Sequence, residues 1–415
     1  MKIWLINHYA VPPEYYPLAR QTYFAKYLQQ QGHEVKIISA SSVHNSKEPV
    51  NLITDGRKWR EEVADGIDHV YIRCCDYSGN GLKRIYNMCE FAWKLPGVCK
   101  KLDRPDAIVA TSMPPMSCAM GIHLARKYKV RGVAEIADLW PESIVAYGIA
   151  GPKHPAVVAL RRLEKWIYQK ADAVVFTMEG AYDYIREQGW EKAVPQDKVF
   201  FINNGVDLAL FDANRDRFQI EDPDLDNPEI FKAVYAGSIR KVNNLGLLLD
   251  AAKAVKNPRL KFLIWGDGDE LGALRKRAED ERIENVAFKG RVDKRYVPYI
   301  VSRADVNFAH NTPSPLFRFG ISFNKLFDYL AAGKPVLSDF PCPYNPAVQA
   351  GAGLNVDEPA PENIAAAVEA LENADRAEYA RMCANARAAA EEYDFKTLTK
   401  KLFAVIEGAK TDAVY

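Results

Sequence analysis

The sequence ADVNFAHNTPSPLFRFGISFNKLFDYLAAGKPVLSD, residues 304–339, decides the fold. It opens with an apolar run typical of a strand, passes through a loop rich in Pro, Asn and Gly, and enters a segment with helical periodicity. The apolar residues of that segment recur at i, i+3, i+4 and i+7: Phe323, Leu326, Phe327 and Leu330. A glycine, Gly333, ends the predicted helix, and an apolar run after it predicts another strand.

Three polar residues, Asn324, Lys325 and Asp328, fall opposite the apolar stripe and close to the helix start. Backbone N–H groups and the positive end of a helix attract phosphates. Lys325 adds a positive charge there, and the Asp328 carboxylate can accept hydrogen bonds from ribose hydroxyls. The pattern therefore suits a nucleotide diphosphate, although a crossover helix with a solvated polar face would show the same spacing.

The alternation of short β-type runs with helical periods continues along the whole chain and favours parallel sheets covered by helices on both faces. Strands are predicted near 2–7, 34–40, 69–73, 106–111, 131–137, 173–176 and 198–202, and again near 232–236, 260–265, 285–289, 305–309, 335–338 and 353–356. Predicted helices include 18–31, 243–256 and 395–408.

The pattern restarts after the turn signal Asn204-Gly205, which predicts two domains. Residues 1–203 and 204–392 are each expected to form a doubly wound, Rossmann-like α/β domain, and a helix within 393–415 is expected to cross back to the first one. The 415 residues suffice for two domains of about 200 residues each. Since ligands bind at the carboxyl ends of parallel strands, two such domains predict a cleft between them.

The composition, 48% hydrophobic and 26% charged, indicates an ordinary globular protein. No apolar run approaches the roughly 18 residues of a membrane-spanning helix, and the start turns polar too soon for a signal peptide. The seven cysteines are odd in number and lack C-x-x-C spacing, so we expect reduced thiols, a cytoplasmic location and no zinc site. Residues 1–203 carry a net charge of +5 and the remainder −4, an offset small enough to be accidental.

The segment 82–101, LKRIYNMCEFAWKLPGVCKK, mixes aromatic and apolar residues with lysines and one arginine. Such a helix can lie in an anionic membrane interface, which would make the protein a peripheral one. A core-packed helix whose lysines extend their charged ends to the solvent explains the composition as well.

The strings FGISFNKLFDYLAAGKPVL and DLWPES strongly resemble retaining GT-B glycosyltransferases, in particular family 4-like bacterial enzymes of surface-polysaccharide synthesis. Many of those enzymes carry two glutamates eight residues apart, the second contacting ribose. Asp328 occupies the second position here, and Gly320 stands at the first. The resemblance therefore implies phosphate contacts from the backbone amides of 320–323, which include Gly320, Ile321 and Ser322.

On the acceptor side, the resemblance places Asp138 of DLWPES against the acceptor hydroxyl, with a role as base. A loop or N-cap carboxylate is the alternative. Relatives often have a Gly-Gly pair in the first loop, where this chain has Pro17-Leu18-Ala19. Arg20 matches a basic position after that pair, and a surface residue at the helix start is the alternative reading.

On the donor side, Gly237 ends a strand, and Arg240 and Lys241 follow in a loop where they could neutralise a departing diphosphate. Relatives place their Arg and Lys where this chain has Ser238 and Asn243, which favours Lys325 for that role. Gly266 lies in a turn that either lets a nucleotide approach closely or simply connects two elements. By resemblance, Arg291 borders the nucleobase.

The resemblance implies a retaining transferase that moves a sugar, an N-acetylhexosamine or a related one, from a UDP-sugar to a lipid-linked saccharide. Asp138, Lys325 and Arg240 are its predicted catalytic residues, and neither a cofactor, a metal nor a nucleic-acid partner is expected. Two alternatives stay open: a UDP-sugar epimerase of the same fold, which needs no acceptor, and a non-catalytic subunit that binds nucleotide sugars.

Overall fold

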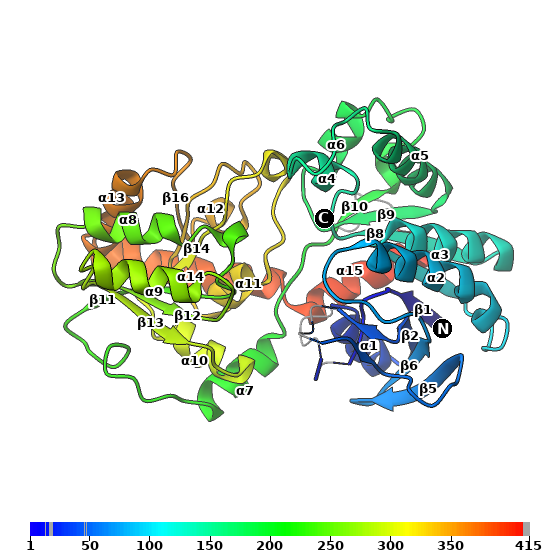
Figure 1. The fold of residues 1–415 in the computed structure, drawn as a ribbon, viewed down its shortest axis with the longest axis horizontal. Helices are drawn as coiled ribbons and strands as arrows, with labels where there is room; N and C mark the ends of the chain where they lie inside the picture. Colours follow the sequence, from blue (N-terminus) through cyan, green and yellow to red (C-terminus); the bar gives the residue numbers. More distant parts are fainter. Residues whose placement is uncertain (13, 16–19, 45, 47, 410–415) are drawn as a thin grey trace. The chain divides into compact units, whose positions relative to one another are not determined.

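The computed structural model describes residues 1–12, 14–15, 20–44, 46 and 48–409. They form two compact units, which are described separately (Figure 1). Unit 1 comprises residues 1–203 and the last helix, and unit 2 comprises Asn204–Asp394. Each is an α/β unit built on a mainly parallel sheet, so the predicted class of two Rossmann-like domains is confirmed.

The main sheet of unit 1 has, among the described residues, eight strands in the order β10-β9-β8-β7-β1-β2-β6-β5. Their bounds are β1 Lys2–Ile6, β2 Glu34–Ala40, β5 Trp59–Ala64, β6 Ile67–Ile72, β7 Ala107–Ser112, β8 Arg131–Ile136, β9 Ala173–Phe176 and β10 Val199–Phe201. The helices are α1 Arg20–Gln30, α2 Leu82–Cys99, α3 Pro115–Tyr128, α4 Glu142–Ala146, α5 Pro155–Lys170, α6 Ala181–Glu187 and α15 Phe395–Glu407.

Strand β5 was not predicted from the sequence, and neither was the small antiparallel ribbon of β3 Ser42–Val43 and β4 Val50–Asn51. β5 pairs antiparallel with β6 at the sheet edge, and the side chains of its central residues 61–63 are exposed. An edge strand with exposed side chains needs no apolar alternation, because backbone pairing and polar side-chain contacts such as the one between Lys36 and Glu61 can hold it. That is why the pattern along WREEVA carried no strand signal.

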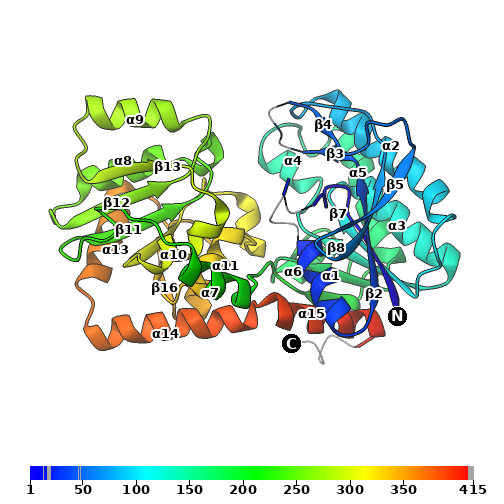
Figure 2. The ribbon, with the colours of Figure 1, turned by 90° about the horizontal axis from the view of Figure 1, so that it is seen from below.

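Helix α15 packs in unit 1 against α1, as Figure 2 shows in red and blue. Its predicted apolar face, Phe395, Leu398, Leu402 and Ile406, is buried in the core of that unit. The rings of Tyr23 and Phe395 stack with centroids 4.4 Å apart. Just before this helix, the Tyr393 carbonyl accepts a hydrogen bond from the Val206 amide of unit 2. The boundary between the units therefore falls after Asp394.

Unit 2 contains, within the described chain, one sheet of six parallel strands in the order β13-β12-β11-β14-β15-β16. The strands are β11 Phe231–Ala236, β12 Leu260–Trp265, β13 Val286–Gly290, β14 Val306–Ala309, β15 Val336–Ser338 and β16 Gly353–Asn355. The helices are α7 Leu208–Arg217, α8 Gly246–Ala254, α9 Leu271–Asp280, α10 Val297–Ser302, α11 Asn324–Ala331, α12 Pro346–Gln349, α13 Pro361–Glu372 and α14 Arg376–Glu392. Short 3₁₀ turns are η1 Gln196–Lys198 in unit 1, and η2 Lys241–Asn243, η3 Lys294–Tyr296 and η4 Pro315–Phe319 here.

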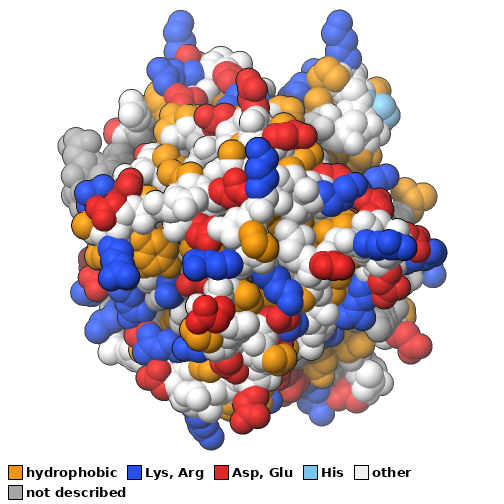
Figure 3. Space-filling view, turned by 90° about the vertical axis from the view of Figure 1, so that its left-hand side faces the viewer, with side chains coloured by type: hydrophobic (Ala, Val, Ile, Leu, Met, Phe, Trp, Pro, Cys, Tyr) orange, Lys and Arg blue, Asp and Glu red, His pale blue; other side chains and the backbone are white. Residues whose placement is uncertain are grey.

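Every strand that the sequence predicted in 204–392 is present within one or two residues. Two cores cover the two faces of this sheet: one includes α11 and α14, the other includes α8 and α13. Figure 3 shows the face of the molecule seen from the left of Figure 1, where positive and negative side chains are interspersed.

Candidate active site

The order of the strands marks one place in unit 2 where a ligand would bind. Numbered along the chain, the strands run outward in opposite directions from β11 and its neighbour β14. The connections that follow these two strands diverge to opposite faces, which opens a crevice at their carboxyl ends. The loop carrying Gly237 follows β11 and the loop carrying His310 follows β14, so both lie at this reversal point.

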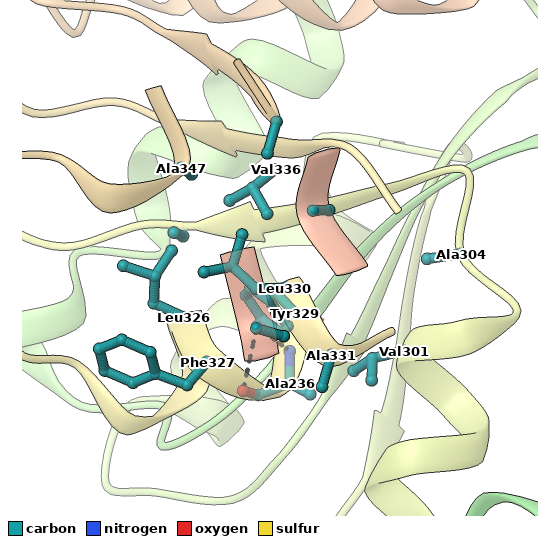
Figure 4. Close-up of a cluster of buried hydrophobic side chains, with 14 of the residues drawn as sticks. Ala236, Val301, Ala304, Leu326, Phe327, Tyr329, Leu330, Ala331, Val336 and Ala347 are labelled. Atoms are coloured by element: carbon teal, nitrogen blue, oxygen red, sulfur yellow. Dashed lines mark hydrogen bonds between the residues drawn. The ribbon is translucent and has the colours of Figure 1, made fainter. Parts of the chain in front are cut away.

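Helix α11 is held close to this reversal point by buried apolar side chains and by hydrogen bonds to Ala236 (Figure 4). Leu326, Phe327 and Leu330 are fully buried, as the apolar stripe predicted, whereas Phe323 is only partly buried. Tyr329 was not predicted to be buried. Its hydroxyl accepts a hydrogen bond from the Ala236 amide at 3.0 Å and donates to the Ala236 carbonyl at 3.2 Å, which ties α11 to the end of β11 (Figure 4).

Lys325 lies on the other side of α11 and points at the end of β11. Its Nζ donates to the Tyr235 hydroxyl at 3.0 Å and to the His310 carbonyl at 3.5 Å, and it sits 4.4 Å from the centroid of the Tyr235 ring. Burial lowers the pKa of Lys325 to about 8 by desolvating the ammonium, against the opposing charge of Asp339. The structure thus holds a half-buried cation with only neutral hydrogen-bond partners. An anion that binds beside it would be strongly stabilised by the positive charge.

The start of α11 offers backbone donors. No side chain caps the helix, and the Ser322, Phe323 and Asn324 amides have no acceptor among the described residues. These unpaired N–H groups and the positive helix end suit a phosphate. The Asn204 side chain donates to the Ser322 carbonyl at 2.9 Å and thereby holds the turn.

Gly320 takes no part in that donor set, because its amide already donates to the Phe317 carbonyl at 2.9 Å. The predicted 320–323 amide cluster therefore loses its first member, and the free amides begin at Ser322. Gly320 has φ 113°, a backbone conformation that side chains rarely adopt. A glycine therefore suits this position of the present chain.

The loop after β11 carries Arg240 and Lys241, whose side chains are exposed and have no partner within the described chain. The backbone of this loop is fixed: the Thr312 amide donates to the Val242 carbonyl at 3.1 Å, and His310 contacts the Asn244 carbonyl. A Cβ on Gly237 would lie 3.1 Å from the Tyr235 hydroxyl and 3.4 Å from Lys325 Nζ. A side chain at position 237 would therefore crowd Lys325 Nζ, and glycine leaves space for it at the end of β11.

Two other predicted residues are placed differently. Gly266 has φ 147°, and a Cβ there would lie 1.8 Å from the Gly237 carbonyl oxygen. Gly266 is thus required because the ends of β11 and β12 approach each other closely there. The structure favours the interpretation of Gly266 as part of a connection between two elements, and not as a contact with a nucleotide. Arg291 is exposed after β13, two strands away from β11, and contacts none of the other predicted site residues among those described.

Asp328 is half-buried on α11 and has no side-chain hydrogen-bond partner in the described chain. Desolvation raises the pKa of its carboxyl, and the nearby charge of Lys294 lowers it. An unpaired, partly desolvated carboxylate gains from donors such as ribose hydroxyls.

In unit 1, two residues near the end of β8 are structural. Glu135 is buried and accepts from Gln21 Nε2 and from the Thr111 hydroxyl, each at 2.7 Å. Arg20 is also buried, with its Nε 3.1 Å from Glu135 and a hydrogen bond from Nη2 to the Ile202 carbonyl. The surface reading of Arg20 is therefore wrong, because the residue pairs with a buried carboxylate. Pro17-Leu18-Ala19 lie outside the described residues.

Asp138 differs from the two other carboxylates of its segment. Glu135 is buried in the network above, and Glu142 is held by Arg161 at 2.6 Å. Asp138 is exposed and has no side-chain partner among the described residues, while Leu139 next to it is buried and anchors the loop. Of the three, only Asp138 is available to an acceptor.

Three residues around Lys325, namely Tyr235, His310 and Asp339, were not predicted from the sequence as parts of the site. Tyr235 and His310 stand at the ends of predicted strands, where a polar residue in an apolar run is the signal that could have found them. No group of three or more potential metal ligands occurs in the described part of the chain. Within the same part, no helix combines the length and the apolar character that crossing a bilayer demands.

Comparison with known proteins assigns a family to each unit. Residues 19–205 match the Glycosyl transferase 4-like domain and residues 216–389 match Glycosyl transferases group 1. WcaI of Escherichia coli (strain K12), provisionally named a glycosyl transferase of colanic acid biosynthesis, is 27% identical over 277 residues, which are 63% of this chain and 65% of WcaI. The chain thus matches less than two thirds of that relative's length.

Solved structures share the fold. Sucrose-phosphate synthase (tll1590) from Thermosynechococcus elongatus aligns with a TM-score of 0.71 over 98% of both chains, at 18% identity. Anabaena Alr3699/HepE in complex with UDP aligns with a TM-score of 0.65 over 98% of this chain and 100% of that one, at 14% identity. Each unit matches a glycosyltransferase family model, and the whole chain shares the fold of solved glycosyltransferases. The chain therefore belongs to the GT-B glycosyltransferases, in their family 4-like class.

Proposed function

We propose that the protein is a retaining glycosyltransferase of surface-polysaccharide synthesis, which moves a sugar from a UDP-sugar to a hydroxyl of a lipid-linked saccharide. The observation that carries the proposal is Lys325, held against Tyr235 beside the uncapped start of α11. WcaI is a relative named for colanic acid biosynthesis, and HepE was solved with UDP. Both support the proposed donor and pathway class.

The donor diphosphate would lie at the reversal point of unit 2. Lys325 and the Ser322 and Phe323 amides would hold its oxygens, and Arg240 and Lys241 would add positive charge. As the bond between sugar and diphosphate breaks, negative charge builds up on the leaving group, and donors already in position stabilise it. The sugar can then be attacked on the face that the diphosphate leaves, which retains the anomeric configuration.

On the acceptor side, Asp138 would accept the proton of the attacking hydroxyl. Its support is the absence of any competing partner for this carboxylate in the described chain, in contrast to Glu135 and Glu142. The chemistry as proposed needs no metal and no cofactor. As the transferred sugar we propose an N-acetylhexosamine or a related sugar, on the sequence resemblance alone.

A donor panel tests the proposal. UDP-, GDP-, ADP- and dTDP-sugars are added to the protein, and the shift of its thermal midpoint is measured. UDP-sugars should stabilise it most, and the best one should then be consumed with release of UDP when membrane extract is added. Consumption without acceptor and without UDP release would favour an epimerase instead, and binding without any turnover would favour a non-catalytic subunit.

Asp328 should contribute directly to donor affinity. Changing Asp328 to alanine is expected to weaken UDP binding by about 1–3 kcal/mol, the usual cost of losing hydrogen bonds to a charged group. Isothermal titration calorimetry measures this, with Asp280→Ala as a control for an exposed carboxylate on α9. Unchanged UDP affinity in the Asp328 variant would remove that residue from the site.

We also propose that helix α2 contacts an anionic lipid surface on the cytoplasmic side. Both readings of segment 82–101 find support, because α2 has two apolar faces. Met88, Phe91 and Leu95 are buried in unit 1. On the opposite face Leu82, Ile85, Tyr86 and Trp93 are exposed, with Leu82 at 83% and Trp93 at 79%. Their spacing of i, i+3, i+4 and i+11 forms one stripe.

The exposed Lys83 and Lys100 favour an anionic lipid surface as the occupant of that stripe. Each lysine near such a surface contributes about 1 kcal/mol to binding, and the aromatic residues suit the interface between headgroups and chains.

Vesicle sedimentation tests this contact. The variant Tyr86→Glu with Trp93→Glu should bind vesicles containing anionic phospholipid at least about tenfold more weakly, because two apolar groups are lost from the interface and two negative charges are added. Val63→Glu changes an exposed apolar residue on β5 and should have no effect. Equal binding of wild type and the double variant would exclude α2 as the membrane contact.

A further inference from the structure

His310 and Asp339 form a buried pair that the proposed reaction does not use. His310 follows β14 and is 1% exposed, and Asp339 follows β15 and is fully buried. The His310 Nδ1 lies 2.5 Å from the Asp339 Oδ2. The other ring nitrogen, Nε2, lies 2.8 Å from the Asn244 carbonyl oxygen.

These two contacts fix one hydrogen of the pair on Nε2 and require one more proton between Nδ1 and Asp339. A carbonyl oxygen only accepts, so His310 Nε2 carries a hydrogen and donates it to Asn244. Nδ1 and the Asp339 carboxyl then need one proton between them, which makes the pair either an imidazolium with a carboxylate or an imidazole with a carboxylic acid. In both forms the pair has no net charge, and in both Nε2 remains a donor.

Within this pair, His310 contacts both parts of the candidate donor site that carry cations, the loop after β11 and helix α11. The Asn244 carbonyl ends the loop that carries Arg240 and Lys241, and the ring of His310 binds it. The backbone carbonyl of the same His310 accepts from Lys325 Nζ at 3.5 Å. One residue therefore bonds the loop after β11 with its side chain and the lysine of α11 with its backbone.

We propose that His310, oriented by Asp339, is a positioning residue that holds the loop of Arg240 and Lys241 at a fixed place relative to Lys325, so that the three cations are preorganised for a diphosphate. This inference rests on the proposed function, because it takes the diphosphate to bind there. Without the Nε2 hydrogen bond the loop has more conformations, and diphosphate binding must order it.

Two variants of similar size separate the two bonds of the ring. His310→Asn places its amide nitrogen near the position of Nδ1, keeps a donor for Asp339 and loses the contact with Asn244. His310→Gln places its amide nitrogen near the position of Nε2 and can restore that contact. We expect His310→Asn to weaken UDP binding about 3- to 10-fold, the effect of one net hydrogen bond, and His310→Gln to recover most of the loss.

Uridine, which lacks the diphosphate, distinguishes positioning from general damage. UDP affinity is measured by calorimetry and uridine affinity by ligand-detected NMR, with His123→Asn, an exposed histidine of α3, as the control. The His310→Asn variant should lose UDP affinity and keep uridine affinity. In a chain that already carries Arg240→Ala and Lys241→Ala, the same change should have no further effect on UDP.

The outcomes that overturn the inference are distinct from a failure of the proposed function. If wild type does not bind UDP, the proposed function fails. If wild type binds it and His310→Asn binds equally well, or loses UDP and uridine affinity alike, His310 does not position the loop. The same holds if His310→Gln restores nothing, or if the loss persists without Arg240 and Lys241.

Discussion

Replacing Lys325 by alanine is expected to lower kcat for sugar transfer about 100- to 1,000-fold, the usual effect of removing one preorganised donor to a developing negative charge. The reason is the position of Nζ beside the uncapped start of α11, with only neutral partners. The thermal midpoint should not fall much, because the change also removes a desolvated charge. UDP release in the presence of acceptor measures the rate, and Lys276→Ala on the exposed face of α9 is the control.

The pH dependence of UDP affinity tests the same lysine independently. Burial lowers the pKa of Lys325 to about 8, so the ammonium predominates below that pH and the neutral amine above it. UDP affinity should therefore fall as the pH rises from about 7.5 to 8.5, a range in which the uracil ring keeps its N3 proton. The terminal phosphate, with a pKa near 6, is already fully ionised in that range. Lys325→Met should show weaker binding and no such fall. An equal fall in both proteins, or wild-type kcat in Lys325→Ala, would exclude the proposed role.

Changing Asp138 to asparagine is expected to lower kcat at least about 100-fold, the range of a general base, while UDP affinity remains within about twofold. The separation follows because Asp138 belongs to unit 1 and the candidate donor site to unit 2. Asparagine keeps the shape of the side chain but cannot take the acceptor's proton.

Glu142→Gln is the matched control for Asp138→Asn. Glu142 lies four residues further along the same segment, and its carboxylate is engaged by Arg161 at 2.6 Å. Its change should reduce stability slightly and leave kcat near wild type. Wild-type turnover in the Asp138 variant would refute its role at the acceptor, and an equal loss in both variants would point to disruption of the loop instead.

The elements of both units could be predicted because their burial follows simple periods. The apolar stripe of α11 and the face of α15 recur at helical spacing, and most strands of unit 2 are short, mainly apolar runs. β5 escaped prediction because an edge strand with an exposed face needs no apolar pattern.

The candidate site could be predicted only in part, because a side chain's spacing does not tell what lies opposite it. Lys325 falls on the polar face of its helix, but its contact with Tyr235 comes from a residue 90 positions away. Arg20 could be either a site residue or a surface residue until Glu135 of β8 is seen beside it. Gly266 could either admit a nucleotide or connect two elements, and only the position of the Gly237 carbonyl favours the second. Such contacts join segments far apart in the sequence, where local patterns carry no information.

A crystal structure of the protein with UDP tests the central claim most directly. The diphosphate oxygens should lie about 2.7–3.2 Å from Lys325 Nζ and from the Ser322 and Phe323 amides, with the ribose at Asp328. A diphosphate bound elsewhere, with Lys325 still hydrogen-bonded to Tyr235, would contradict the account.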